Sequence, residues 1–403
     1  MTESSARWRG LDAFRGLAVI GMLLVNNPGD HDAVYRQLAH SAWHGCTLAD
    51  LVFPFFLFVV GITTEITLSR LLDTGRTSRR IWRRAVVIFG IGLFLNWFPF
   101  YQSGIIAWTS HPGFLDRLAE RLLILRIPGV LQRIAVVYLV TALVARRASL
   151  RTIVAITALL LLGYWALLTA VPVPGEGAVG AALLDSPSKT IVAHVDRALF
   201  DWSRWGLGNH LWDSALTWDP EGVLSTLPSI ATALLGVILA RVVRRSSSSA
   251  AQGSFASLRM TLGAGTAAIA VGWIWSVVFP LNKSLWTSSF VLFTAGTATI
   301  LLVALTFALE RRPGAWWAKP LIVFGENPLV AYAGSELARR ILHSSIKIKS
   351  ANGRLGTDEW VFRQFEYVGL SPKAASLAWA LLFLAAWLLA LSHLSRRRLF
   401  VRA

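Results

Sequence analysis

The chain contains very little cysteine and little charge. Cys46 is the only cysteine among 403 residues, which excludes a disulfide within the chain. Charged residues make up 15% of the chain and hydrophobic residues 55%, whereas a typical soluble domain has about 25% charged residues. This balance excludes an ordinary soluble domain and indicates a protein that lies in a lipid bilayer.

The sequence also lacks the usual signs of a metal site or of nucleic-acid binding. His40 and His44 are four residues apart, but Trp43 and Gly45 do not suggest a regular helix and no HExxH motif is present. We therefore expect no metal. The formal net charge is +17, but Lys and Arg occur in short clusters between apolar runs, as topology signals do. We expect no nucleic-acid partner.

Roughly ten apolar segments are close to the length needed to cross about 30 Å of hydrocarbon. They predict an all-α, polytopic membrane bundle of about ten transmembrane helices that forms a single integral-membrane domain, 1–403. The first run lacks a small-residue cleavage site, so we expect a retained helix and not a removed signal peptide. The segments are 12–28, 51–72, 84–100, 127–145, 150–171, 222–243, 262–281, 285–309, 319–339 and 374–394.

Ten spans place most basic clusters on one side, which the positive-inside rule makes the cytoplasm, together with both termini. A basic group between 339 and 354 fits poorly, because it falls outside. The acidic and aromatic segment 172–221 is predicted to be a periplasmic subregion folded over the outer mouth of the bundle. The serine-rich segment 246–260 is predicted to be a flexible cytoplasmic loop.

Polar side chains occur where the first two apolar segments meet. His40 lies in the outer loop between them and can act as general base or nucleophile near neutral pH. The alternative is a loop histidine that only hydrogen-bonds the backbone. Asn26, at the end of the first segment, could orient His40 or hold a carbonyl oxygen as its charge develops. The alternative is an interfacial asparagine at a helix end.

Other ionisable residues interrupt the apolar segments. Asp50 opens the second segment and could cap it, and Arg15 lies near the start of the first. Gln132 and Arg133 lie near the start of the fourth segment. A buried arginine in a membrane protein usually has a partner or binds an anion, and arginine suits phosphate. A structural ion pair of Arg133 with Glu65 or Asp50 is the alternative.

Three polar stretches fall at helix ends or breaks, where membrane proteins tend to build ligand sites. They are Trp218–Gly222, Pro280–Thr287 and Gly325–Leu329. Each could equally be a tight turn with capping residues.

These blocks together resemble the heparan-α-glucosaminide N-acetyltransferase family of membrane enzymes and its bacterial members. The likeness runs over nearly the whole chain, with the blocks in the family's order. The blocks are Asp12–Gly16, Val25–Asn26, His40–Pro54, Arg126–Arg133, Asp219–Gly222 and Asn282–Trp286.

The resemblance implies an acyl-CoA-dependent enzyme that moves acetyl from cytosolic acetyl-CoA to an amino sugar across the membrane. In the family, the histidine matching His40 is regarded as the active-site residue and the asparagine matching Asn26 as its neighbour. As cofactor-binding candidates we take Arg15, Arg133, Gln132 and Trp286. As substrate-binding candidates we take Trp43, Asp50, Asp219, Glu221 and Asn282.

The compact ten-span form implies a bacterial inner-membrane protein, with an amino sugar of an envelope glycan or glycolipid as acceptor. A homodimer is also considered. Two rival functions remain at this stage. One is a solute transporter or flippase, although no inverted repeat supports it. The other is a membrane O-acyltransferase of envelope sugars.

Overall fold

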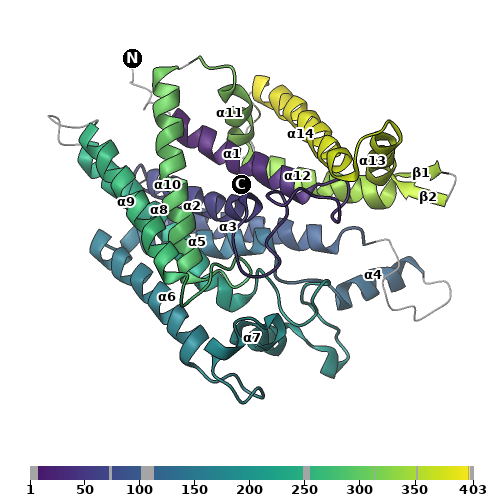
Figure 1. The fold of residues 1–403 in the computed structure, drawn as a ribbon, viewed down its shortest axis with the longest axis horizontal. Coiled ribbons are helices and arrows are strands. Elements are labelled where there is room, and N and C mark those ends of the chain that lie inside the picture. Colours follow the sequence, from purple (N-terminus) through teal and green to yellow (C-terminus); the bar gives the residue numbers. More distant parts are fainter. Residues whose placement is uncertain are drawn as a thin grey trace.

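The protein is described by a computed structural model covering residues 8–71, 75–100, 113–247, 255–312, 314–350, 353–397 and 399. Within these residues the chain forms fourteen α-helices, most of them long and packed side by side (Figure 1). The ten predicted segments all coincide with helices, the ninth as two. The apolar periodicity of the sequence therefore located the helices correctly.

The ten segments correspond to eleven helices. These are α1 (Arg9–Asn26), α2 (Leu48–Leu68), α3 (Gly75–Trp97), α5 (Val130–Arg147), α6 (Leu150–Ala170), α8 (Val223–Ser247), α9 (Phe255–Trp275), α10 (Ser288–Arg311), α11 (Ala318–Glu326), α12 (Pro328–Arg340) and α14 (Pro372–Arg396). Helices α8 and α9 extend into both ends of the predicted loop 246–260, and residues 248–254 lie outside the described residues.

Within the described part of the chain, five helices are long and apolar enough to cross a membrane: α2, α6, α8, α10 and α14. The predicted number of about ten is not confirmed. One reason is visible at Asn327, where the ninth segment breaks into helices of 9 and 13 residues. Each is shorter than the roughly 20 residues that a crossing requires.

A small β-hairpin is the exception to the all-α prediction. Strands β1 (Lys347–Ser350) and β2 (Gly353–Gly356) pair antiparallel, with Lys347 opposite Gly356. The hairpin lies between α12 and α13 (Thr357–Tyr367) at the right-hand edge of Figure 1. The hairpin includes part of the basic group between 339 and 354, which the predicted ten-span topology places on the outer side.

The bundle is held together by close helix pairs, which include α2 with α8, α9 with α10 and α1 with α11. Helices α1 and α11 approach closely at Gly16 and Gly325, where a Cβ on either glycine would collide with a backbone oxygen of the other helix. Small residues permit such contact in membrane bundles, where van der Waals packing drives association. Glu65 at the end of α2 pairs with Arg241 and Arg244 of α8.

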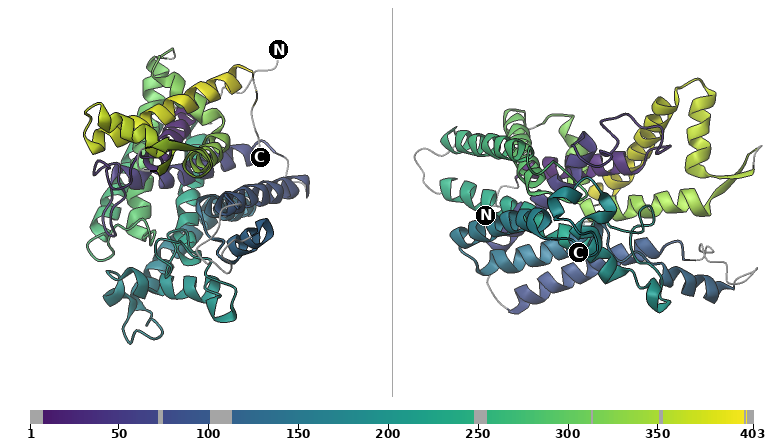
Figure 2. Two further views of the ribbon diagram at one scale, coloured as in Figure 1. Left: turned by 90° about the vertical axis from the view of Figure 1, so that its right-hand side faces the viewer. Right: turned by 60° about the horizontal axis from the view of Figure 1, so that its bottom comes forward.

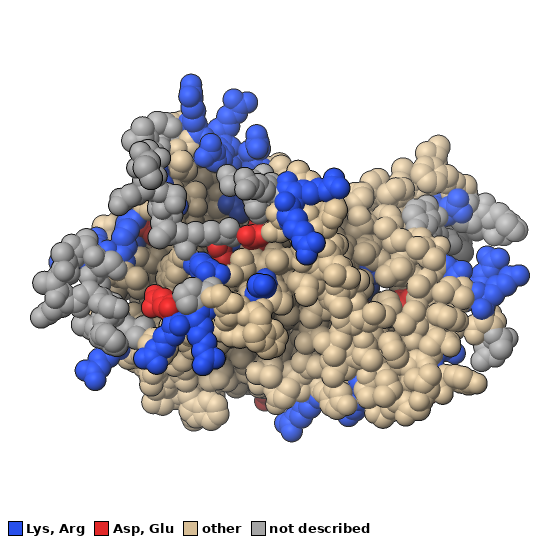
Figure 3. Space-filling model, turned by 90° about the horizontal axis from the view of Figure 1, so that it is seen from above, with Lys and Arg blue, Asp and Glu red and all other residues tan. Residues whose placement is uncertain are grey.

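The segment 172–221 is folded rather than extended. It contains the 3₁₀ turns η1 (Gly180–Leu183), η2 (Pro187–Lys189) and η3 (Ser203–Trp205), and α7 (Ile191–Phe200). The region around α7 lies at the lower end of Figure 1, and Figure 2 shows the same placement from two other sides. Seen from the opposite end, Figure 3 shows many Lys and Arg side chains and few acidic ones. That is the charge balance expected of a cytoplasmic face.

Candidate active site

His40 is hydrogen-bonded to Asp50 in the loop that joins α1 to α2. The distance from His40 Nδ1 to Asp50 Oδ1 is 2.9 Å, and the His40 side chain is 42% exposed while that of Asp50 is buried. Because the carboxylate accepts the Nδ1 proton, Nε2 is the ring nitrogen that keeps a lone pair. This is the arrangement that orients a histidine for proton transfer or nucleophilic attack.

Asp50 also fixes the start of α2. Its Oδ2 accepts hydrogen bonds from the Ser41 backbone N–H at 3.1 Å and from the Thr47 backbone N–H at 3.0 Å. Asp50 thus takes part in capping α2, as the third residue of a capping box whose N-cap is Thr47 and not as the N-cap itself. Since both carboxylate oxygens already have protein partners, the geometry favours a positioning role for Asp50 over direct contact with a substrate.

Lys283 reaches His40 from a loop 243 residues away in the sequence. Its Nζ lies 3.1 Å from His40 Nε2 and 3.3 Å from His40 Nδ1, so the amine contacts the imidazole close to both ring nitrogens. Burial lowers the pKa of Lys283, against the attraction of Glu221 and Asp50. In the sequence, Lys283 stands out only as part of the polar stretch Pro280–Thr287 and of the family block Asn282–Trp286. Its position beside the histidine depends on how the loop between α9 and α10 packs.

The neighbouring Asn282 is buried and holds the same loop in place. Its Oδ1 accepts the Leu285 backbone N–H at 2.7 Å, and its Nδ2 lies 3.2 Å from His44 Nδ1. His44 in turn places Nε2 2.9 Å from Asp185 Oδ1, in the segment 172–221. Asn282 therefore connects the two loops that carry His40 and Lys283.

Aromatic side chains join the His40 loop to the folded outer segment. Trp43 donates from Nε1 to the Leu184 carbonyl at 2.7 Å. Its ring packs edge-to-face on Trp218 at 5.3 Å between centroids, and Trp218 packs in the same way on Trp212 at 5.4 Å. The segment 172–221 thus contacts the candidate site directly.

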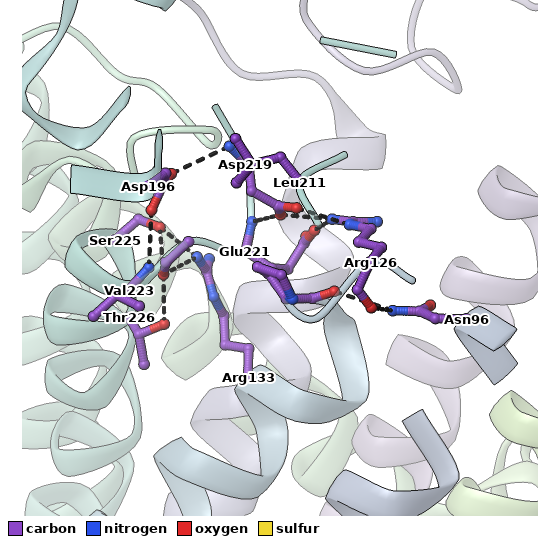
Figure 4. A network of polar contacts seen from close by, with 12 residues as sticks. Asn96, Arg126, Arg133, Asp196, Leu211, Asp219, Glu221, Val223, Ser225 and Thr226 are labelled. Atoms are coloured by element: carbon purple, nitrogen blue, oxygen red, sulfur yellow. Dashed lines mark hydrogen bonds and ion pairs between the residues drawn. The ribbon is translucent and has the colours of Figure 1, made fainter. Parts of the chain in front are cut away.

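Asp219 and Glu221 both pair with Arg126, which belongs to the family block Arg126–Arg133 but was not among the predicted site residues (Figure 4). Arg126 donates from Nε to Asp219 Oδ2 at 2.8 Å and from Nη2 to Glu221 Oε2 at 2.5 Å. Burial opposes the charges, yet the attraction between them keeps the pKa of Arg126 above and that of Glu221 below its ordinary value. Lys283 also lowers the pKa of Glu221, which places this triad beside the His40 cluster.

Arg133 is almost fully buried one turn into α5, where it points toward the start of α8 (Figure 4). Its Nη2 donates to the Gly222 carbonyl at 3.3 Å and to Ser225 Oγ. Nε and Nη1 are buried without an acceptor in the part of the chain that the structure describes. The predicted ion pair with Glu65 or Asp50 is not formed, since those carboxylates have other partners. Two donors of Arg133 are therefore left without an acceptor inside the bundle.

Trp286 packs its indole ring against the guanidinium of Arg133. The guanidinium lies 5.1 Å from the centre of the indole ring, in a cation–π contact. The indole N–H donates to Thr232 at 3.0 Å, and the side chain is buried. The Trp286 backbone has φ of 54°, which is unusual for a bulky residue and is typical of functional sites.

Asp196, on α7, is a buried carboxylate that accepts the backbone N–H groups of Asp219 and Val223 at 3.2 Å each. Burial raises its pKa to about 7, against these hydrogen bonds. Asp196 holds the turn that carries Asp219 and Glu221.

Three predicted residues lie apart from this cluster or make no hydrogen bond within it. Asn26 ends α1 and forms no side-chain hydrogen bond to any described residue. Arg15 donates from Nε to the Gly325 carbonyl at 2.6 Å and pairs with Asp12, so it joins α1 to α11. Gln132 is buried, and its Nε2 has no acceptor among the described residues. Those residues also include no group of three or more metal-ligating side chains.

Comparisons with known proteins agree with the predicted resemblance. A family model described as heparan-alpha-glucosaminide N-acetyltransferase, catalytic, matches residues 7–174. Curated relatives of that name from Mus musculus and Homo sapiens are each 29% identical, over 83% and 85% of this chain. The chain spans about half the length of these relatives, 54% and 55%. The resemblance is confirmed: this chain is similar to heparan-alpha-glucosaminide N-acetyltransferases over most of its own length.

Proposed function

We propose that this protein is a membrane acetyltransferase that moves acetyl from cytosolic acetyl-CoA to an amino sugar on the outer side of the membrane. The observation that carries the proposal is the arrangement of Asp50, His40 and Lys283. A buried carboxylate fixes the histidine, whose second nitrogen is accessible and is contacted by an amine. The similarity to named N-acetyltransferases supports the reaction class.

The chemistry requires a base at His40 Nε2. In direct transfer, the sugar amine attacks the thioester carbonyl, His40 takes the amine proton, and the C–S bond breaks. The thiolate of CoA then receives that proton. In the two-step route, His40 Nε2 attacks the thioester carbonyl, the C–S bond breaks and CoA leaves as the thiolate. The sugar amine then attacks the acetyl-histidine, the N–acetyl bond to His40 breaks, and the proton that the amine loses goes to the thiolate by way of His40. Both routes remain open in the proposal.

The remaining residues take roles that follow from their positions. Arg133, with free donors beside Trp286, is assigned to a carbonyl or phosphate oxygen of the donor, and Gln132 and Arg15 to the acetyl-CoA path. Asn26 is assigned to the reacting carbonyl. On the acceptor side, Trp43 and Asn282 shape the outer wall. Asp219 and Glu221 fix Arg126 there.

The location follows from topology. We propose a bacterial inner-membrane protein with both termini in the cytoplasm, because the basic clusters gather at one end of the bundle. The acceptor is then an envelope glycan or glycolipid. A second copy of the chain could complete a homodimer.

The test is CoA release by purified protein from acetyl-CoA, with and without glucosamine, in wild type and His40→Ala. We expect glucosamine-dependent release that falls to background in His40→Ala, with unchanged elution and thermal unfolding. The matched control is His343→Ala. His343 forms a similar pair with Asp358 at 3.0 Å in another part of the chain, next to the β-hairpin.

The outcomes separate the alternatives. Normal activity in His40→Ala would refute the assignment of His40. Equal losses in both histidine variants would indicate a general structural effect. A burst of one CoA per protein without acceptor would select the acetyl-histidine route. Release with hydroxyl sugars alone would replace the proposal with an O-acyltransferase.

A further inference from the structure

A polar cavity of about 350 Å³ lies between the end of α3, the segment leading into α5, and the end of α12. Four arginines line it: Arg121, Arg126, Arg339 and Arg340. Arg121 lies in α4 (Phe114–Leu123), and Arg339 and Arg340 end α12. The last two belong to the basic group that the positive-inside rule left unexplained.

Two of the four arginines are neutralised by protein carboxylates and two are not. Arg126 pairs with Asp219 and Glu221, and Arg339 with Glu336 at 3.3 Å. Arg340 donates from Nη1 to the Phe98 carbonyl at 3.0 Å. No carboxylate of the described residues pairs with Arg121 or Arg340. Asp213 also lines the cavity but is exposed. The residues that line the cavity are thus four arginines against two carboxylates, Asp213 and Glu336, and the two arginines without a carboxylate partner are Arg121 and Arg340.

The lining also carries buried donors without acceptors. These are the Nε atoms of Arg121, Arg339 and Arg340 and the Nε2 of Gln132, whose side chain is almost fully buried. A buried donor without a partner is costly, so such groups are normally satisfied. Because these atoms have almost no accessible surface, a ligand would meet the outer guanidinium nitrogens of the lining arginines, whose fork matches phosphate and carboxylate geometry.

The cavity adjoins the candidate active site. Arg126 lines the cavity and also binds Glu221, which interacts electrostatically with Lys283, the partner of His40. On the other side, Trp212 lines the cavity and packs on Trp218, which packs on Trp43. A ligand in the cavity would lie only a few side chains from His40.

We propose that this cavity binds an anionic group, a phosphate, sulfate or carboxylate, carried by the acceptor glycan. Arg121 and Arg340 are its specificity-determining residues, and the acceptor is an anionic amino sugar. The inference rests on the proposed acetyltransferase function for the identity of the ligand. A volume near the lower end of small-molecule sites suits one substituted sugar unit. CoA is a second source of the same phosphate chemistry, which the experiment separates.

The test is equilibrium binding to the full-length protein in detergent, without turnover. The probes are glucosamine 6-phosphate, glucosamine and CoA. We expect wild type to bind glucosamine 6-phosphate at least about tenfold more tightly than glucosamine, the size of one charge-assisted contact. In Arg121→Gln and in Arg121→Gln/Arg340→Gln, the ratio of the two affinities should fall toward one. Arg121→Gln removes no hydrogen bond or ion pair within the described protein, so the fold should persist.

The control is Arg363→Gln, which removes a surface arginine of α13 that pairs with Glu359. It should leave all three affinities unchanged. Equal binding of glucosamine 6-phosphate to wild type and the double variant would overturn the proposal. A double variant that loses affinity for CoA alone would also overturn it, because the cavity would then belong to the acetyl donor. Binding as predicted without acetyl transfer would support the anion site and refute the acetyltransferase function.

Discussion

Removing Arg126 should destabilise the protein strongly, because its two carboxylate partners stay behind. Asp219 is completely buried and Glu221 nearly so, and Arg126 donates hydrogen bonds to both. In Arg126→Met the apolar stem is roughly retained and the charge is lost. Asp219 then keeps the Glu221 backbone N–H at 2.9 Å as a donor. Glu221 keeps only the more distant attraction of Arg133 and Lys283.

The expected magnitude follows from this arrangement. Breaking a buried ion pair by removing one partner costs about 3–5 kcal/mol, mainly because a charge is left uncompensated. We expect a loss in this range for Arg126→Met. Neutralising the carboxylates as well, in Arg126→Met/Asp219→Asn/Glu221→Gln, removes the uncompensated charge. This triple variant should recover about 2 kcal/mol, roughly the cost of one buried unsatisfied group.

The assay is reversible unfolding in mixed micelles at pH 8 and pH 5. Without Arg126, Glu221 loses the main charge that lowers its folded-state pKa, so that pKa rises and protonation relieves the variant as the pH falls. The difference in free energy of unfolding between wild type and Arg126→Met should therefore be larger at pH 8 than at pH 5. Arg363→Met is the matched control, since it breaks an exposed arginine–carboxylate pair and should cost less than about 1 kcal/mol.

Two results would refute this reasoning. A cost below about 1 kcal/mol at pH 8 would show that the triad contributes no more than a surface pair. A triple variant less stable than Arg126→Met would show that the cost arises from lost packing or lost hydrogen bonds and not from uncompensated charge.

Two further predictions concern stability. The folded-state pKa of Asp196 is raised from 3.8 to about 7. The stability that the protonated carboxyl contributes to the fold is therefore fully present below pH 4 and is lost as the pH rises to 7. Between pH 4 and pH 7, the free energy of unfolding of wild type should fall by on the order of 4 kcal/mol relative to that of Asp196→Asn, as measured by unfolding at each pH. Curves of unfolding free energy against pH that run parallel for the two proteins would contradict the raised pKa. Gly325→Ala should cost about 1–3 kcal/mol, because the new Cβ meets the Asp12 carbonyl oxygen where α11 crosses α1. The control Gly163→Ala, on α6 with open space around it, should be neutral or stabilising in the same melts. Equal changes in stability for Gly325→Ala and Gly163→Ala would show that the close contact between α1 and α11 is not the cause.

The sequence by itself determined where the helices lie. Apolar periodicity is local, and each predicted segment matches one helix or, at Asn327, two short ones. The cap at Asp50 was also readable, since a capping interaction spans only three residues. Membrane crossing was less readable. Five helices of the described residues meet the length and apolarity required, and whether a polar helix crosses depends on neighbours that shield its charges.

The tertiary structure alone decided which polar groups meet. Arg126 pairs with carboxylates 93 and 95 residues away, and Lys283 reaches His40 across 243 residues. Spacing along the chain carries no information on such pairs, because they depend on how helices cross and how loops return. For the same reason the basic residues Arg339 and Arg340 look misplaced in the sequence, yet they line a cavity in the fold. Local pattern encodes the helices, whereas their packing assembles the site.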